Sequence, residues 1–196
     1  MEWKILNQIL KHLRNLRVIS NTSPLIYLSK IGRLDLLHHM FDTVYVPSAV
    51  VTEILRGKEL TYGFASAIEV EDAIENGWIK IIELESDDDD LAEKYSHDPG
   101  IHPGEAEMLS IGKKFDLLLL DDLGARTFAK ALGFDIVGTI GVILHAYDSE
   151  LISFTEFEEC MDDLEYYDFW IHPHLKRKII AEAESIKFKQ EHIDKK

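Results

Sequence analysis

The chain has 196 residues, 46% hydrophobic and 10% aromatic, which is enough apolar material for a buried core and excludes a disordered polymer. Acids outnumber bases 36 to 21, and the formal net charge of −15 disfavours a protein that binds nucleic acid over its whole surface. One cysteine, Cys160, excludes an intrachain disulfide framework, and no apolar run approaches the roughly 20 residues that span a bilayer. We expect a cytoplasmic protein without a membrane partner.

The first half of the chain alternates helical and strand patterns. Residues 2–16 carry apolar side chains at helical spacing, which predicts a packing helix. Short apolar runs predict strands at 17–20, 43–46 and 78–84. Helical spacing predicts the helices that follow them, at 25–31, 34–41, 48–57 and 64–75. Thr22 or Ser23 is expected to cap the first of these helices, with Pro24 in its first turn.

The second half continues this alternation after a polar segment. Residues 87–103 are rich in acids and turn residues, and we expect a loop there. Strands are predicted at 117–120, a run of four leucines, and at 135–137. Helices are predicted at 103–114, 123–132, 140–148, 153–166 and 172–190. Five alternations of strand and helix are typical of an α/β fold with a mostly parallel sheet.

The acidic excess is confined to two segments. Residues 83–98 carry eight acids and one base, and residues 150–168 carry eight acids and no base. The rest of the chain is balanced, with 20 acids and 20 bases. The helix at 153–166 is expected to pack one face and to expose an acidic one, which could receive a basic partner.

Polar side chains follow the predicted strands at the edge where parallel sheets bind ligands. Asn21 follows the first strand, and Asp121 and Asp122 follow the four leucines; Glu53 and Glu105 lie on helices that lead away from the same edge. Such oxygens suit Mg²⁺ or Mn²⁺, which can activate water against a phosphodiester. Each acid also has an ordinary alternative: either aspartate can cap the next helix, and Glu53 could face solvent.

Basic residues near these helices could bind the phosphates of a nucleic acid, although ordinary solvated surface charge is the default interpretation for each. They are Arg126, Lys130, Lys30, Arg33 and Arg56. Arg126 and Lys130 lie four residues apart and share a helix face. The histidine pairs at 97 and 102 and at 172 and 174 have no companion pattern that would complete a zinc site.

Several short motifs occur in a characteristic order. They are Ser20-Asn21-Thr22-Ser23-Pro24-Leu25-Ile26, Leu34-Asp35-Leu36-Leu37, Val46-Pro47-Ser48-Ala49-Val50, Pro103-Gly104-Glu105-Ala106-Glu107, Leu120-Asp121-Asp122 and Gly138-Thr139-Ile140-Gly141. Together they resemble the PIN-domain superfamily, and especially its prokaryotic branch of VapC-like toxin nucleases. The resemblance runs from about residue 18 to 152 and, more weakly, through 171–179.

The resemblance implies a three-layer α/β/α fold with a five-stranded, mostly parallel central sheet, and an RNA-cleaving hydrolase that uses Mg²⁺ or Mn²⁺. It implies metal ligation by Asn21, Glu53, Glu105 and Asp122, with Asp121 as the alternative to its neighbour Asp122. It also implies catalytic roles for the four acids, Glu53, Glu105, Asp121 and Asp122. Glu107, two residues along a helix, cannot point the same way as Glu105. The best-known relatives are toxins, so a cognate antitoxin protein and a homodimer are also implied.

Asn21 departs from the superfamily, whose usual residue here is Asp. An amide oxygen can bind a hard cation but brings no charge and cannot act as a base, which leaves open a weakly active or inactive binding module. A phosphoacceptor of the receiver type is disfavoured, because the acid pair of that fold follows the first strand, whereas Asp121 and Asp122 come late in this chain.

We expect a helical extension at 1–16, a nuclease domain at 17–152 and a C-terminal helical extension at 153–196 packed on that domain.

Overall fold

The computed structural model describes residues 14–57 and 64–193. The chain divides into two compact units, of which the first ends at Thr139 and the second begins at Ile140. The helix predicted at 2–16 falls almost wholly outside the described residues, and the domain boundaries predicted at residues 16 and 152 stay predictions. Within the described residues, no helix combines the length and apolar character needed to cross a membrane.

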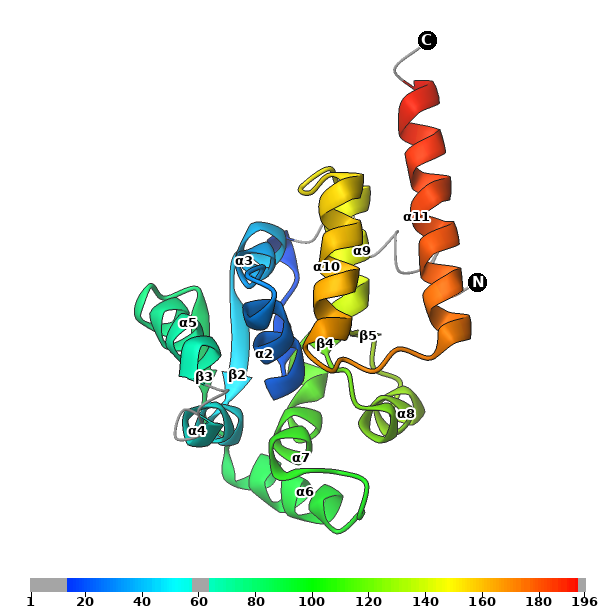
Figure 1. Ribbon diagram of the computed structural model, residues 1–196. Coiled ribbons are helices and arrows are strands. Elements are labelled where there is room, and N and C mark those ends of the chain that lie inside the picture. Colours follow the sequence, from blue (N-terminus) through cyan, green and yellow to red (C-terminus); the bar gives the residue numbers. More distant parts are fainter. Residues whose placement is uncertain (1–13, 58–63, 194–196) are drawn as a thin grey trace. The chain divides into compact units, whose positions relative to one another are not determined.

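The first unit is built on a five-stranded sheet in which every pairing is parallel, in the order β3-β2-β1-β4-β5 (Figure 1). The strands are β1 (Val18–Ser20), β2 (Val44–Pro47), β3 (Ile79–Ile82), β4 (Leu117–Leu119) and β5 (Ile136–Val137). From β1 the chain builds outward through β2 and β3, then returns to place β4 on the other side of β1. The point where the strand order reverses therefore lies between β1 and β4, and such points form ligand-binding crevices.

Helices connect the strands. Those of the first unit are α2 (Thr22–Lys30), α3 (Asp35–Phe41), α4 (Ser48–Gly57), α5 (Phe64–Glu75), α6 (Ser86–Ser96), α7 (Pro103–Ser110) and α8 (Leu123–Ala131), with a 3₁₀ turn, η2 (Gly112–Lys114). The second unit contains α9 (Thr139–Asp148), which starts on the last residue of the first unit, then α10 (Phe154–Tyr166) and α11 (Pro173–Ile193). Most of these boundaries lie within two residues of the predicted ones.

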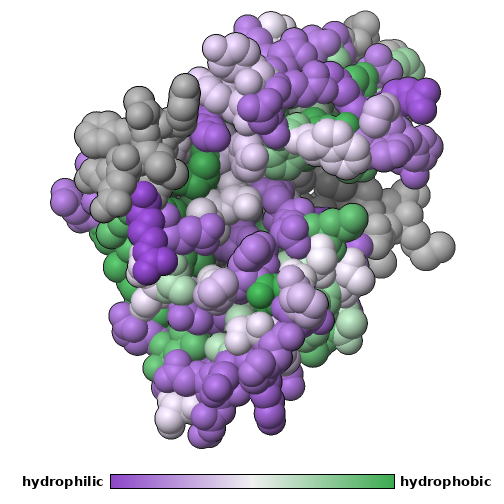
Figure 2. Space-filling model, turned by 60° about the horizontal axis from the view of Figure 1, so that its bottom comes forward, coloured by the Kyte–Doolittle hydropathy of each residue, from purple (hydrophilic) through white to green (hydrophobic). Residues whose placement is uncertain are grey.

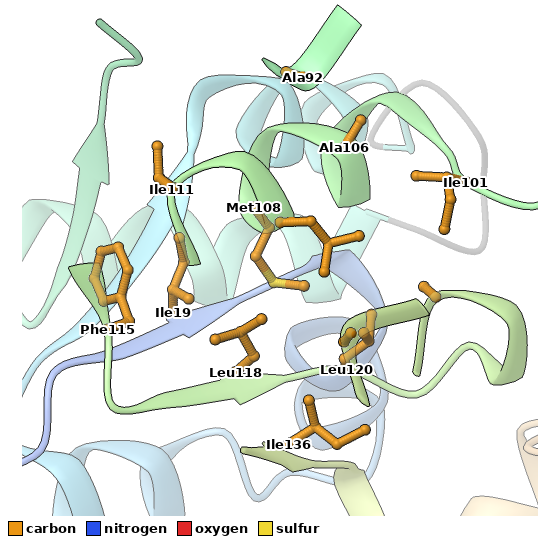
Figure 3. Packing of buried hydrophobic residues seen from close by; sticks show 13 residues of the cluster. Ile19, Ala92, Ile101, Ala106, Met108, Ile111, Phe115, Leu118, Leu120 and Ile136 are labelled. Atoms are coloured by element: carbon orange, nitrogen blue, oxygen red, sulfur yellow. The ribbon is translucent and has the colours of Figure 1, made fainter. Parts of the chain in front are cut away.

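Both faces of the sheet are buried at its centre, where β1 and β4 lie. Ile19 and Leu118 are paired in register on β1 and β4 and point toward Met108 of α7 (Figure 3). Their neighbours Val18 and Leu117, also paired in register, are fully buried too, and alternation along a strand puts them on the opposite face. This confirms the predicted three-layer α/β/α fold with a five-stranded, mostly parallel sheet, in which every observed pairing is parallel.

The loop predicted at 87–103 is wrong, because its first part forms α6. The backbone N–H of Glu85 donates to the carboxylate of Asp88 at 3.3 Å, and the acids of this first turn lie at the positive end of the helix. Lys114 bonds Asp88 at 2.6 Å, and Ala92 packs into the buried cluster of Figure 3. The run of acids that resembled a loop is therefore the start of a helix, which packs against the buried cluster through Ala92.

Hydrophilic residues predominate on the face of the molecule in Figure 2.

The helix cap predicted at Thr22 or Ser23 is also wrong. Asn21 occupies the position before α2, without a side-chain capping hydrogen bond, and Thr22 is already part of the helix. The side chains of Asn21 and Thr22 are instead directed to two other predicted site residues, described below.

The second unit keeps the predicted division of α10 into two faces. Phe157, Cys160, Met161 and Leu164 are buried on one face. The rings of Tyr147, Phe154 and Phe157 contact one another with centroids 5.6–6.2 Å apart. The opposite face exposes acids: Glu158, Glu159, Asp162 and Asp163.

Candidate active site

Asn21 is fixed at the carboxyl edge of the sheet, next to the point where the strand order reverses. Its backbone N–H donates to the carbonyl oxygen of Leu119 at 3.1 Å, which extends the pairing of β1 with β4 by one residue. Only 4% of Asn21 is exposed. The sheet therefore holds the amide side chain in one buried place, as predicted from its position after the first strand.

The side chain of Asn21 contacts Glu105. Asn21 Nδ2 donates to Glu105 Oε1 at 3.4 Å, and the backbone N–H of His102 donates to Glu105 Oε2 at 3.0 Å. Glu105 lies in the first turn of α7 and is only 5% exposed. Among the described residues, the other amide atom, Asn21 Oδ1, is buried and accepts no hydrogen bond. Burying such an oxygen without a partner costs free energy, so this atom is suited to a ligand.

The pKa of Glu105 is influenced by the charges of two more predicted residues. Burial raises the pKa of the Glu105 carboxyl above its ordinary value, more than the His102 N–H lowers it. The negative charges of Asp122 and Glu53 raise this pKa further. Asn21, Glu53, Glu105 and Asp122, predicted from four separate segments, are thus brought to one edge of the sheet.

Glu53 reaches the site from α4 as an exposed side chain. Its Oε2 atom accepts a 2.6 Å hydrogen bond from the hydroxyl of Thr22, one residue after Asn21. A Cβ at Gly104 would lie 3.1 Å from Val50 Cγ2 and 3.6 Å from Glu53 Oε2, so α7 approaches α4 closely here. Glycine at position 104 therefore allows α7, which carries Glu105, to pack closely against α4, which carries Glu53.

Glu107 has a different role from Glu105, as predicted. Its Oε2 atom accepts a 3.0 Å hydrogen bond from the backbone N–H of Ala49, in the first turn of α4. This bond satisfies an N–H at a helix start and ties α7 to α4.

The two neighbouring aspartates differ in their partners. Asp122 occupies the N-cap of α8, where Oδ1 accepts from Ala125 N at 2.8 Å. Asp121 instead accepts from the backbone N–H of Thr139 at 2.7 Å and from its hydroxyl at 2.6 Å. Burial raises the pKa of Asp121, against the lowering effect of the Thr139 hydrogen bonds and of the positive charge of Arg126. One of the pair was expected to cap α8, and Asp122 is the one that does.

The predicted RNA-binding residues fall into two groups. Arg126 lies beside the site, because its Nη1 atom donates to the carbonyl oxygen of Leu120 at 2.6 Å, and exposed Lys130 follows one turn later on α8. Exposed Arg56 lies three residues after Glu53 on α4. Lys30 is the last residue of α2 and Arg33 follows that helix, so both lie at the end opposite Asn21, roughly 13 Å along the axis of a nine-residue helix. The structure does not bring these last two to the site.

The oxygen atoms at this edge are of the hard kind that a divalent cation prefers, although acids alone do not form a complete cage. In residues 14–57 and 64–193, no three His, Cys, Asp or Glu side chains are close enough to hold a metal ion. The donor set combines the unpartnered Asn21 Oδ1 with the carboxylates of Glu105 and Asp122, all hard oxygens. A cation would give the amide oxygen a partner and would offset the repulsion that raises the Glu105 pKa.

Two contacts of this edge were not foreseen in the sequence. Thr22 was expected to cap a helix, yet its hydroxyl binds Glu53. Thr139 belongs to the Gly138-Thr139 motif but carried no predicted role, and it binds Asp121 across 18 residues of sequence. Both threonines belong to the motifs that resemble the PIN-domain superfamily, but those motifs do not indicate which residues the threonines contact.

Comparison with known protein families gives one clear result. A family model described as a PIN domain matches residues 17–185, which include all five strands and every site residue described above. No curated protein matches the chain. PIN domains are generally nucleases, and they typically depend on divalent metal ions. The chain belongs to the PIN-domain family.

Proposed function

We propose that the protein is a metal-dependent endoribonuclease that hydrolyses RNA phosphodiester bonds. The observation that carries this proposal is the buried Asn21 Oδ1 atom, without a partner among the described residues, beside the buried carboxylate of Glu105. An unsatisfied oxygen next to a carboxylate whose pKa is raised is costly for a folded protein unless a ligand is bound there. Membership of a family of nucleases supports the choice of ligand and reaction.

The proposed ligands of Mg²⁺ or Mn²⁺ are Asn21, Glu105 and Asp122, with Glu53 assisting from α4. A bound ion of this kind supplies a water of lowered pKa and stabilises the negative charge that develops on phosphate oxygens. The chain orients these ligands: the His102 N–H holds Glu105, the Ala125 N–H holds Asp122, and the Thr22 hydroxyl holds Glu53. Because Asn21 is neutral, the affinity for the ion is expected to be lower than with an aspartate at this position.

Arg126, Lys130 and Arg56 are the proposed phosphate contacts. Arg126 lies on α8 and its guanidinium reaches Leu120 at the end of β4, while Lys130 and Arg56 lie on the helices that follow Asp122 and carry Glu53. The two acidic segments, 83–98 and 150–168, supply the whole net charge of −15, so RNA binding is expected to be weak, sensitive to salt and confined to this edge.

Within this function, we infer that the protein is the toxin of a toxin–antitoxin pair that works in the cytoplasm as a homodimer. The motif order that resembles VapC-like toxins supports this setting. The exposed acidic face of α10 is a suitable surface for a basic segment of a partner protein.

The experiment compares cleavage of single-stranded RNA in Mn²⁺ by the wild type, Glu105→Gln and Asp122→Asn. Asparagine still caps helices, so Asp122→Asn removes charge with little effect on α8. The matched controls are Glu107→Gln on the same helix and Asp135→Asn at the amino end of β5. We expect both site variants to lose at least about 100-fold in rate and both controls to cleave like the wild type. Equal cleavage by all variants, or none by any over a wide range of RNAs, contradicts the proposal.

A second candidate function is a binding module without catalysis. It is favoured by the neutral Asn21 and by the absence, within the described residues, of three clustered acidic, histidine or cysteine side chains. The variant Asn21→Asp separates the two functions. An inactive wild type that gains Mn²⁺-dependent cleavage through this change supports the binding module.

A further inference from the structure

Asp121 and Thr139 join the carboxyl ends of two neighbouring strands. Asp121 follows β4 and Thr139 follows β5, and the backbone pairing of these strands continues to Leu120, whose N–H donates to Val137 O at 2.8 Å. Just beyond it, both carboxylate oxygens of Asp121 accept short bonds from Thr139, at 2.7 Å from the backbone and 2.6 Å from the hydroxyl. The bonds from Thr139 to the Asp121 carboxylate therefore continue the connection between β4 and β5 beyond the end of their backbone pairing.

Arg126 and Gly138 complete this arrangement. Arg126 Nη1 donates to Leu120 O at 2.6 Å, and its positive charge acts on Asp121. A Cβ added to Gly138 would lie 2.5 Å from Asp121 Oδ1, 2.9 Å from Arg126 Nη1 and 3.4 Å from Leu120 O. The carboxylate and the guanidinium therefore pack directly on the bare backbone of Gly138, and no larger residue fits there without moving them.

The position of Asp122 depends on this contact, because a single peptide bond separates it from Asp121. Asp122 begins α8, and its Oδ1 atom accepts from Ala125 N at 2.8 Å. Arg126 lies one turn further on the same helix, and its backbone N–H donates to Asp122 O at 2.9 Å. The turn that carries Asp122 is thus held at Asp121 on one side and at Arg126 on the other.

We propose that Asp121, Thr139 and Arg126 form a clasp that positions Asp122, so that Asp121 is a positioning residue and not a metal ligand. Charge-assisted bonds as short as those from Thr139 are among the stronger hydrogen bonds in proteins, and ligation of a cation through Asp121 would have to compete with both. The clasp rests on the proposed function of Asp122, but its geometry can be tested separately from RNA cleavage.

The test compares Thr139→Val, which removes the hydroxyl at nearly constant shape, with Thr139→Ser, which keeps it. Thr127→Val is the matched control, because the Thr127 hydroxyl bonds Leu123 O of its own helix. The first readout is amide hydrogen exchange at Ala125, whose N–H reports on the Asp122 carboxylate. The second readout is kcat and KM for a cleaved RNA, measured at a temperature where every variant is folded.

We expect Thr139→Val to speed exchange at Ala125 by about tenfold. We also expect it to lower kcat by about 10- to 100-fold with little change in KM. Thr139→Ser should restore both values, and Thr127→Val should match the wild type. Gly138→Ala should act like Thr139→Val, and it replaces that variant in the test if the valine does not fold.

Unchanged exchange at Ala125 in Thr139→Val and Gly138→Ala overturns the clasp, whatever the enzyme does to RNA. Faster exchange with an unchanged kcat overturns its role in catalysis. A wild type that cleaves no RNA contradicts the proposed function instead, and the exchange data then decide the clasp alone.

Discussion

The amide nitrogen of Asn21 donates to the carboxylate of Glu105 at 3.4 Å, and the amide oxygen of the same side chain is buried and unpartnered among the described residues. The donor half of the amide thus stabilises the ionised glutamate, and the acceptor half is left available. An aspartate at position 21 could not donate, and two buried carboxylates would face each other. Asparagine therefore suits the ligand-free protein, at the expected cost of weaker cation binding.

Asn21→Asp should make the ligand-free protein less stable and the cation affinity higher. Losing the amide donor beside a buried carboxylate is expected to lower the free energy of unfolding by about 1–3 kcal/mol. Mn²⁺ at 100 times its Kd should restore about 2.7 kcal/mol, since it binds only the folded state. Thermal unfolding with and without Mn²⁺ measures both effects. A variant as stable as the wild type in chelator would show that the Asn21–Glu105 contact does not matter.

Glu105→Gln should change how stability depends on pH. Folded Glu105 has a raised pKa, so the folded state holds this proton more tightly than the unfolded chain does. The free energy of unfolding of the wild type therefore falls as pH rises from the ordinary glutamate pKa through the raised one. Glutamine removes this fall and should make the metal-free protein more stable than the wild type at neutral pH.

Chemical denaturation at a series of pH values measures the difference between Glu105→Gln and the wild type. Two other groups also make the free energy of unfolding depend on pH, in both proteins alike. The raised pKa of Asp121 makes it fall as pH rises, and the pKa of His145, lowered by burial, makes it rise. Those slopes cancel in the difference. A difference that does not vary with pH contradicts the assignment to Glu105.

The strands and most helices follow from local patterns, and α6 shows where such patterns fail. The leucines of β4 form an apolar run bounded by Asp116 and Asp121, which is enough to predict a buried strand. The acids of α6 resemble a loop because their supports are distant in sequence: Lys114 bonds Asp88 from 26 residues away, and Ala92 is buried against other elements. A helix that depends on tertiary contacts cannot be predicted from its own residues alone.

The candidate site shows the same limit. Asn21 and Asp122 could be placed because parallel strands end at one edge, and Glu105 because it starts a helix near that edge. The bond from Thr139 to Asp121 depends on the pairing of β4 with β5, which no local pattern specifies. Thr22 was misassigned because a threonine near a helix start is most often a cap, whereas here Glu53 of α4 is within reach of its hydroxyl.

Thr22→Val should reduce activity more than stability. The Thr22 hydroxyl holds the exposed carboxylate of Glu53 at 2.6 Å, and a hydrogen bond at an exposed group contributes only about 1 kcal/mol or less to folding. Misplacing Glu53 is expected to lower the rate of RNA cleavage by about tenfold.

Cleavage kinetics and thermal unfolding of Thr22→Val, Thr22→Ser and Thr52→Val separate these effects. Serine keeps the hydroxyl and should cleave like the wild type. Thr52 is the control on α4, since its hydroxyl bonds Ser48 O within the same helix. Equal activity of Thr22→Val and Thr52→Val would remove Thr22 from the site.

Gly112→Ala should destabilise the first unit without touching the site. A Cβ at Gly112 would lie 2.8 Å from the ring of Phe134, which packs against the buried cluster, so the ring has to shift. Overpacking of this kind is expected to cost about 1–3 kcal/mol of unfolding free energy. Urea denaturation measures it, with Gly100→Ala, in an exposed turn, as a control that should lose less. A Gly112→Ala protein as stable as the wild type contradicts the close packing seen here.

The central claim is that Asn21, Glu105 and Asp122 form one site for a divalent cation. Calorimetric titration with Mn²⁺ tests it most directly, on the wild type, Asp122→Asn and the control Glu107→Gln. We predict saturable binding by the wild type and by Glu107→Gln, with an affinity about 10- to 100-fold lower in Asp122→Asn. Equal affinity in all three proteins, or no saturable binding by the wild type at millimolar Mn²⁺, would contradict the claim.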